Sequence, residues 1–309
     1  MRRGIVWGLA GIAAWMLACR FVPGLAALWQ GAVSGAALGM LHRAAAALPF
    51  PVIEPLALAV PLMALGRRGP RRLAAALMVA AGMYALLWYP AYWARPAQVC
   101  PRSEAARVEA LCADLIDALN AADPDFDGAA EAAGDVAGVP WARVKAARYP
   151  EWMAALGVSG LFSPWTGEVV VNPEASPACR PFTCVHELIH LRGVADEGAA
   201  NIEAYRACLR RGGAFAYSAR LWALRYALER LSATDPEACR RCLGRMNPPL
   251  ERNFIPFDAA EPNPVARVLG IGSVTADYDM LVDWLAGEGT WNREQGTGNV
   301  AAARSPQMY

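Results

Sequence analysis

The sequence is poor in charge of either sign and contains few histidines. Charged residues make up 18% of the 309 residues, the formal net charge is +1, and there are three histidines. A near-neutral chain has no electrostatic basis for binding nucleic acid, so we exclude that partner. No internal repeat is visible, which excludes a repeat array. With 56% hydrophobic residues, the chain is too apolar for one soluble domain, and its length fits a membrane part followed by a compact domain of about 200 residues.

The cysteines lack the paired motifs of a structural zinc ribbon. The single C-x-x-C motif, Cys239-Arg240-Arg241-Cys242, has no second pair with which to share a metal, although its spacing also suits redox chemistry. Outside the cytoplasm the cysteines after residue 95 can form disulfides that leave at least one unpaired; they are Cys100, Cys112, Cys179, Cys184, Cys208, Cys239 and Cys242. A bridge between Cys179 and Cys184 would stiffen the turn that precedes the next motif.

Two of the three histidines stand four residues apart, in His186-Glu187-Leu188-Ile189-His190. On a helix, positions i and i+4 share a face, so both imidazoles can bind one tetrahedral zinc ion. Glu187 then points at the water in the open coordination position and acts as general base. The third histidine, His42, lies far upstream in an apolar segment. A helix whose histidines only cap or pack is the weaker interpretation in a chain with so few of them.

The residues around this motif predict a strand, a helix and a turn. Valine content marks a strand over Glu168–Asn172, which Pro173 ends. Thr183 is the expected N-cap of the zinc helix, and Gly193 ends that helix, so the following chain folds back toward the metal. We expect the strand edge to pair with an extended peptide and to bring its carbonyl to the zinc ion.

Three acids compete for the third ligand position. Glu197 is favoured because it begins an E-x-x-A-N string on a second helix, with Asn201 one turn later near the ligands. Asp196 instead stands where the H-E-x-x-H-x-x-G-x-x-H class places its third histidine. Glu203 lies beside two arginines and is expected to face solvent. A site with Glu203 or with no third protein ligand is therefore the weakest alternative.

Three apolar segments predict transmembrane spans at about 4–20, 48–66 and 73–93. Four arginines in the loop 67–72 and two at positions 2 and 3 place that loop and the N-terminus in the cytoplasm, so the chain after Arg95 lies outside. Segment 21–47 carries small residues at spacing four and is expected to form an interfacial or re-entrant helix. A signal peptide with a lipoprotein-like box at 16–19 is the alternative for the first span.

This topology divides the chain into three parts. Residues 1–95 form a membrane domain, 96–287 an extracytoplasmic zinc metallopeptidase domain, and 288–309 a tail that is low in apolar residues and is expected to be disordered. Hydrophobic periodicity predicts helices in the second part over Glu104–Ala121, Trp141–Leu156, Asn201–Arg211, Ala214–Leu231 and Ala276–Leu285.

The chain resembles the DUF3810 family, bacterial membrane proteins that are predicted zinc metallopeptidases with N-terminal transmembrane helices. Its specific motifs lie between about residues 150 and 210, namely Pro164 to Glu168, Val171-Asn172, Pro181 to Thr183, His186 to His190, Gly193, Glu197, Ala200-Asn201 and Ala204-Tyr205. The family's E-x-E-A-N pattern maps onto Glu197, Ala199, Ala200 and Asn201, so its second acid is missing here. The resemblance implies Glu197 as the third ligand. It also implies that relatives carry a basic residue where this chain has Asp196, which argues against Asp196 as a ligand.

The resemblance also implies an oxyanion-stabilising residue in the terminal helix, for which Tyr278 is preferred to Tyr205 and Arg192. The expected fold is mainly α, with N-terminal transmembrane helices and a zincin-like α+β domain whose small sheet edge lies next to the H-E-x-x-H helix.

The sequence therefore predicts a Zn²⁺-dependent metallopeptidase in the bacterial cell membrane. It is multi-pass, its catalytic domain is extracytoplasmic, and its partners are the lipid bilayer and a peptide or protein substrate. The alternative is a membrane-tethered sensor or interaction protein whose zinc site is structural or regulatory, which would need no acid between its ligands. An intramembrane protease is disfavoured because charged residues lie within and on both sides of the helix that carries the motif, whereas an intramembrane zinc helix would be part of a long apolar span.

Overall fold

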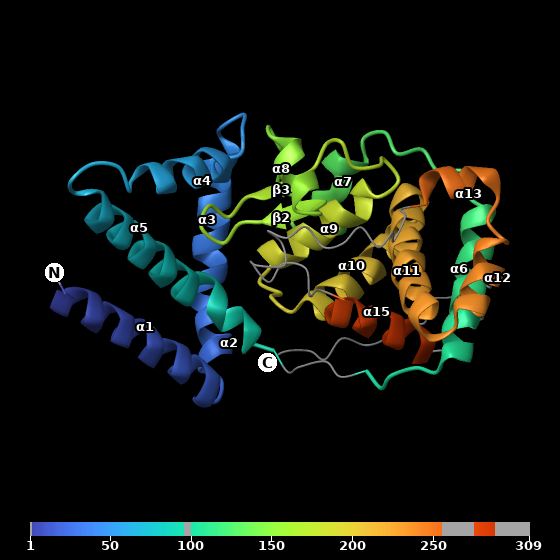
Figure 1. Cartoon of the computed structure of the whole chain (residues 1–309), viewed down its shortest axis with the longest axis horizontal. Coiled ribbons are helices and arrows are strands. Elements are labelled where there is room, and N and C mark those ends of the chain that lie inside the picture. The colour runs from blue at the N-terminus through green and yellow to red at the C-terminus, as the bar shows by residue number, and fades with distance from the viewer. Residues whose placement is uncertain (1, 96–99, 255–274, 288–309) are drawn as a thin grey trace.

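A computed structural model describes residues 2–95, 100–254 and 275–287 (Figure 1). The N-terminal part is entirely helical, and its elements are α1 (Arg2–Phe21), α2 (Leu25–Trp29), η1 (Gln30–Ser34), α3 (Gly35–Ala46), α4 (Ile53–Leu62), α5 (Gly69–Met83), η2 (Tyr84–Trp88) and η3 (Tyr89–Tyr92). Within the described residues, two helical stretches are long and apolar enough to cross a membrane, Gly4–Phe21 and Gly69–Tyr92. They coincide with the first and third predicted spans.

The second predicted span, 48–66, is not a full-length helix. Only α4 forms there, with ten residues, which reach about 15 Å at 1.5 Å per residue, or half of the hydrocarbon core. Pro51 precedes the helix, Pro61 lies near its end, and both prolines lack the N–H that a continuous ladder needs. Segment 21–47 is more regular than expected, because α2, η1 and α3 follow one another from Leu25 to Ala46.

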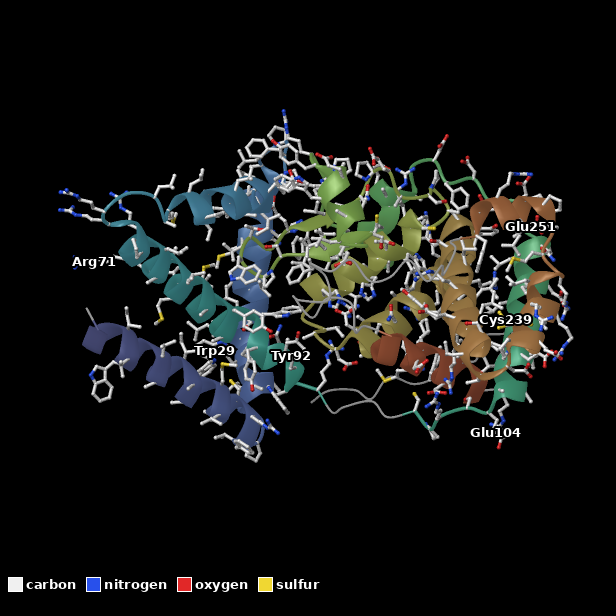
Figure 2. The ribbon with its side chains drawn as sticks, in the orientation of Figure 1. Trp29, Arg71, Tyr92, Glu104, Cys239 and Glu251 are labelled. Carbon is white, nitrogen blue, oxygen red and sulfur yellow. The ribbon has the colours of Figure 1, made fainter. Side chains whose placement is uncertain are left out.

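The N-terminal helices lie to one side of the rest of the molecule. In Figure 1, α1 and α5 run side by side with the chain's beginning and the 63–68 loop at their outer ends, and α3 stands between them and the remaining domain. Figure 2 accordingly shows Arg71 at the outer tip and Tyr92 near the domain. Apolar side chains such as Trp7, Leu62 and Val79 are exposed on these helices, as expected of surfaces that face lipid.

The π-helical turn η2 joins these helices to one another. The wider π-helical turn leaves backbone carbonyls free to accept hydrogen bonds from side chains of other helices. The Trp15 Nε1–H donates to the carbonyl of Ala85 over 2.8 Å, and the Trp29 Nε1–H donates to that of Leu86 over 2.7 Å. Ser34 also donates to Leu86. The end of α5 is thereby fixed against α1 and α2.

The remaining domain is mainly helical and contains a small sheet. Its helices are α6 (Ala105–Asn120), α7 (Ala129–Val136), α8 (Pro150–Ala155), α9 (Arg180–Leu191), α10 (Glu197–Arg211), α11 (Gly213–Thr234), α12 (Pro236–Leu243), α13 (Pro248–Asn253) and α15 (Thr275–Gly287). The core forms around α11, which packs on α6, α9 and α10. Leu221, Leu224, Leu228 and Leu231 of α11 are fully buried and follow the three- and four-residue spacing of one helix face.

The sheet has the strand order β1-β3-β2, which corrects one expectation. Its strands are β1 (Val144–Ala146), β2 (Gly160–Phe162) and β3 (Val169–Val171), with β1 parallel and β2 antiparallel to β3. The valine-rich strand is therefore central and completely buried, so it has no edge to offer a peptide. The edge strand on the side of α9 is β2.

Two local predictions are also wrong. Residues 141–156 are not one helix, because Val144 pairs with β3 and Pro150 starts a new helix, α8. Thr183 is not the N-cap of α9, which begins three residues earlier, at Arg180 after Cys179. The hydroxyl of Thr183 instead donates to the carbonyl of Cys179. Cys179 and Cys184, for which the sequence left a bridge open, are free thiols.

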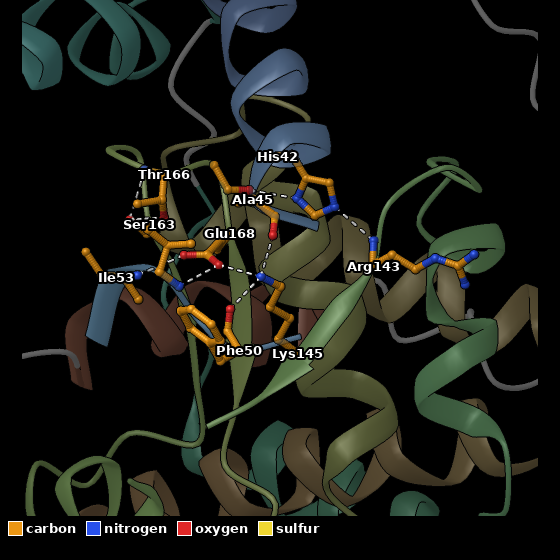
Figure 3. Close-up of polar contacts among 11 residues, drawn as sticks. His42, Ala45, Phe50, Ile53, Arg143, Lys145, Ser163, Thr166 and Glu168 are labelled. Atoms are coloured by element: carbon orange, nitrogen blue, oxygen red, sulfur yellow. Dashed lines mark hydrogen bonds and ion pairs between the residues drawn. The ribbon is translucent and has the colours of Figure 1, made fainter. Parts of the chain in front are cut away.

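A buried polar junction holds α3 and α4 against the sheet (Figure 3). Lys145, the only lysine of the chain, donates to Glu168 over 2.8 Å and to the carbonyls of Ala45 and Phe50. Glu168, 1% exposed, also accepts from the backbone N–H groups at positions 52 and 53, where α4 begins. Burial raises the pKa of Glu168, but these hydrogen bonds outweigh it and hold the pKa below its ordinary value.

His42 completes the junction as a neutral imidazole. Its Nδ1 lies 2.8 Å from the carbonyl of Gly167 and must donate, while its Nε2 accepts from the N–H of Arg143 over 2.9 Å. Burial lowers the pKa of His42, which agrees with one nitrogen serving as an acceptor. His42, the one histidine outside the H-E-x-x-H motif, is thus a structural residue that links α3 to the hairpin between β2 and β3.

Candidate metal centre

Helix α9 presents the two histidines of the motif to one point. The helix is buried over Pro181–Leu191, and because i and i+4 positions share a face, His186 and His190 project together. Their Nε2 atoms lie 3.0 Å apart. Glu187 lies between them in sequence but on a different face of the helix.

Glu197 comes from the next helix and joins the pair. Gly193 adopts φ +87°, a left-handed conformation that ends α9 and reverses the chain. Helix α10 then starts at Glu197, whose Oε2 lies 3.1 Å from Nε2 of His186 and 3.4 Å from Nε2 of His190. Its side chain is 37% exposed, so the cluster opens to solvent on this side.

The three atoms fit a tetrahedral zinc ion. Ligands about 2.05 Å from a tetrahedral ion lie about 3.3 Å from one another, and the measured edges are 3.0, 3.1 and 3.4 Å. The Nδ1–H of His190 donates to the carbonyl of Val194 over 2.6 Å, which leaves the lone pair of Nε2 for a metal. In the described part of the chain, His186, His190 and Glu197 are the only group of three or more such side chains that could hold a metal ion.

Two further polar groups lie buried near the ligands. Nδ1 of His186 and both amide atoms of Asn201 have no hydrogen-bond partner among the described residues. Asn201 follows Glu197 by one helical turn on α10 and is fully buried. The Asn201 amide therefore has unused hydrogen-bonding capacity one helical turn from Glu197.

The charges of the cluster complement one another. Burial raises the pKa of Glu197, but hydrogen bonds from the two imidazoles outweigh it and hold the pKa well below its ordinary value. Burial lowers the pKa of His190, but the hydrogen bond and charge of Glu197 outweigh it and raise the pKa to about 9. The carboxylate of Glu197 is therefore ionised. A metal ion that binds here must displace the proton that the His190 imidazole holds at neutral pH.

Glu187 packs against the edge strand β2 and interacts electrostatically with all three residues of the cluster. Its carboxylate accepts from the backbone N–H of Phe162, and burial raises its pKa. A Cβ on Gly160 would lie 2.8 Å from both Cγ and Oε1 of Glu187, so the absence of a side chain there allows this close approach. Glu187 is thus held by the strand, within one turn of both histidines but outside the group of ligand atoms.

The hydrogen bonds between β2 and β3 show which backbone groups of β2 point away from the sheet. Ser163 donates to Glu168 and Asn172 donates to Ser159, so positions 159, 161 and 163 direct their backbone groups toward β3. Positions 160 and 162 alternate with them and direct theirs outward. The outward N–H of position 162 is the one that meets Glu187.

The N-terminal part also contacts the site. The ring of Trp88, in η2, lies 4.9 Å from that of Phe162 and 5.9 Å from that of His190 between centroids. The Gln30 amide packs against Gly193, where a Cβ would collide with it. The helices of the first 95 residues are therefore part of the wall around the cluster.

The other candidates lie elsewhere. Asp196 is the N-cap of α10 and accepts from the N–H of Ala199 over 2.7 Å. Glu203 pairs with Arg95 and Arg192 on the surface. Tyr205 is buried against Trp284. Tyr278 belongs to α15, and its side chain lies outside the described residues.

Sequence reasoning missed the residues that come from other elements. Gly160, Phe162, Val194 and Trp88 each touch a residue of the motif, yet none belongs to a recognisable pattern with it. The one available signal was Gly160, since a glycine inside a strand often marks the close approach of another group. Segment 157–162 is too short for its periodicity to mark it as a strand.

A family model described as "Protein of unknown function (DUF3810)" matches residues 67–259, more than half of the 309 residues. The matched range contains the cluster, Glu187, the sheet and α5. No curated protein and no solved structure matches the chain.

Proposed function

The chain belongs to the DUF3810 family, and we propose that it is a membrane-anchored zinc metallopeptidase that hydrolyses peptide bonds outside the cytoplasm. The observation that carries the proposal is the separation of roles on α9. His186, His190 and Glu197 converge on one point, while Glu187 lies beside them, buried and bound to β2. A structural metal site has no need of such a fourth, non-ligating acid. We propose a zincin-like relationship for the domain on the same ground.

The chemistry follows from these positions. When bound, zinc supplies Lewis-acid polarisation of the scissile carbonyl and acidifies a water molecule. Glu187 accepts a proton from the attacking water and passes it to the leaving amine. The water oxygen is added to the carbonyl carbon as the C–N bond breaks, so the products are a carboxylate and an amine. Tyr278 is the proposed oxyanion-stabilising residue.

The edge of β2 suits an extended polypeptide as substrate. Positions 160 and 162 direct backbone groups away from β3. Glu187 binds the N–H of position 162, and the remaining outward groups have the arrangement by which a sheet edge recruits another strand. A peptide paired there lies beside Glu187. Antiparallel pairing is the more stable geometry and continues that of β2 and β3. The peptide class of the substrate rests on this edge together with the cluster.

We propose three membrane crossings, by α1, α4 and α5, with α2 to α3 along the outer surface. The arginines at the end of the helices that lies farthest from the remaining domain, Arg71 among them (Figure 2), favour a cytoplasmic location for that end. Helix α4 alone is too short, so residues 63–66 and local thinning of the bilayer would complete its crossing. A reporter fused after Arg72 is expected to behave as cytoplasmic and one after Arg102 as external. External labelling of the arginine loop in intact cells would contradict this topology.

Glu187→Gln tests the peptidase directly. The full chain, purified in detergent, is loaded with zinc and digested against a peptide library, with metal content measured in parallel. The variant is expected to keep wild-type zinc stoichiometry and to lose at least about 100-fold in kcat/KM, the usual contribution of a general base. Equal loss of zinc would place Glu187 among the ligands. A wild-type chain that binds zinc tightly but cleaves nothing would favour the sensor alternative.

A further inference from the structure

The candidate site lies against the end of a membrane span. Trp88 belongs to the apolar stretch Gly69–Tyr92, and its ring contacts those of His190 and Phe162. Gln30, in the helical segment between the first two spans, packs on the Gly193 turn between the ligands. Two separate segments of the N-terminal part therefore reach the cluster.

This contact places the site near one end of the proposed span. Only four residues follow Trp88 to the end of the stretch at Tyr92, and the ring of Trp88 lies 5.9 Å from that of His190. His190 therefore lies close to the bilayer rather than at the far end of a projecting domain.

The edge strand has a fixed direction relative to the membrane part. Strand β2 runs from Gly160 to Phe162 and continues into the 163–168 hairpin, which reaches across α3 toward α5 (Figure 1). Trp165 at the hairpin donates to the carbonyl of Ala80 in α5 over 3.0 Å, and Gly167 accepts from His42 in α3. The C-terminal end of β2 is thus its membrane end.

A strand paired antiparallel to β2 has the opposite polarity. Its N-terminal residues lie beside Phe162 and the hairpin, and its C-terminal residues lie beside Gly160. A chain that leaves the bilayer at the hairpin and passes the cluster in this direction therefore has its membrane anchor before the scissile bond.

We propose that the substrate is a polypeptide anchored in the same membrane by a segment on the N-terminal side of the scissile bond, and cut within about ten residues of the bilayer, a length that extended chain spans in about 33 Å. The proposal rests on the peptidase function above and names its substrate class. Anchoring enzyme and substrate in one bilayer raises their effective concentration, which offsets weak recognition along a short edge strand.

The test uses one peptide that the free-peptide assay has identified as cleavable. It is attached to a phospholipid through either its N-terminus or its C-terminus, with spacers of about 4, 10 and 30 residues, and incorporated into phosphatidylcholine–phosphatidylglycerol vesicles that carry the full zinc-loaded chain. The free peptide and the Glu187→Gln chain are controls.

The N-terminally anchored peptide with about 4 or 10 spacer residues is expected to be cut at least about 10-fold faster than the free peptide at equal total concentration. The same peptide anchored through its C-terminus is expected to show no such gain at short spacers, and detergent should abolish the gain. Equal or faster cutting of the C-terminal form, or no gain from either anchor, would overturn this inference while Glu187-dependent cutting of free peptide upheld the peptidase. Absence of Glu187-dependent cutting in every form would overturn both.

Discussion

Gly160→Ala is expected to impair hydrolysis while leaving metal binding intact. The new Cβ would lie 2.6 Å from Cγ2 of Thr183 and 2.8 Å from Cγ and Oε1 of Glu187, where ordinary contact begins at 3.4 Å. The side chains must therefore move by about 0.6 to 0.8 Å, the differences between these distances, and Glu187 has no free space because it is buried. A misplacement near 1 Å costs up to about 100-fold in rate, so we expect a 10- to 100-fold loss of kcat/KM.

The assay compares initial rates, zinc content and thermal unfolding of the full chain. Overpacking is expected to cost about 1 to 3 kcal/mol of stability, and zinc stoichiometry should stay at the wild-type value because no ligand atom contacts Gly160. Gly287→Ala is the matched control, since a Cβ there meets nothing within 4 Å. A Gly160→Ala chain with the wild-type rate would refute the close approach of β2 to Glu187.

Three further predictions address the ligands and the junction. Glu197→Ala should lower zinc affinity by orders of magnitude, whereas Asp196→Ala should cost only a cap, about 1 kcal/mol of stability; equal affinities in equilibrium dialysis would contradict the assignment. Lys145→Met leaves Glu168 buried without its cation and should lower the unfolding free energy by about 3 to 5 kcal/mol; an unchanged melting temperature would argue against the junction. Because burial lowers the pKa of His42, the unfolded chain binds more protons between that pKa and about 6.5, so stability should fall as pH drops below about 6.5. His42→Gln should flatten this dependence in melting curves between pH 7.5 and 5, and an unaltered slope would exclude His42 as its source.

Local patterns determined a large part of this protein. The motif His186 to His190 needs only helical periodicity to bring two imidazoles together, and α9 forms there. Hydropathy alone predicted the stretches Gly4–Phe21 and Gly69–Tyr92. Apolar spacing predicted α6 and α11, and the motifs around Glu197 predicted the family that the match confirms. These features depend on residues within a few turns of one another, so the sequence carries them directly.

The tertiary structure decided what distant segments do to the motif. Asp196 and Glu197 are neighbours in sequence, and only the Gly193 turn and the start of α10 direct one to cap the helix and the other to the histidines. The edge strand is β2 rather than β3, because β1 arrives from another part of the chain to pair with β3. Trp88 meets His190 across about a hundred residues.

The N-terminal part illustrates the same limit. The composition of residues 48–66 suits a span, yet α4 is ten residues long, because prolines interrupt the backbone ladder and because Glu168 binds the amides where α4 begins. In the sequence, His42 is an isolated polar residue in an apolar segment. Only in the folded structure do Gly167 and Arg143 provide its two hydrogen-bond partners. Backbone propensity and side-chain periodicity are local properties, whereas the partner of a buried polar group is chosen by which elements pack together, and that choice is made only when the whole chain has folded.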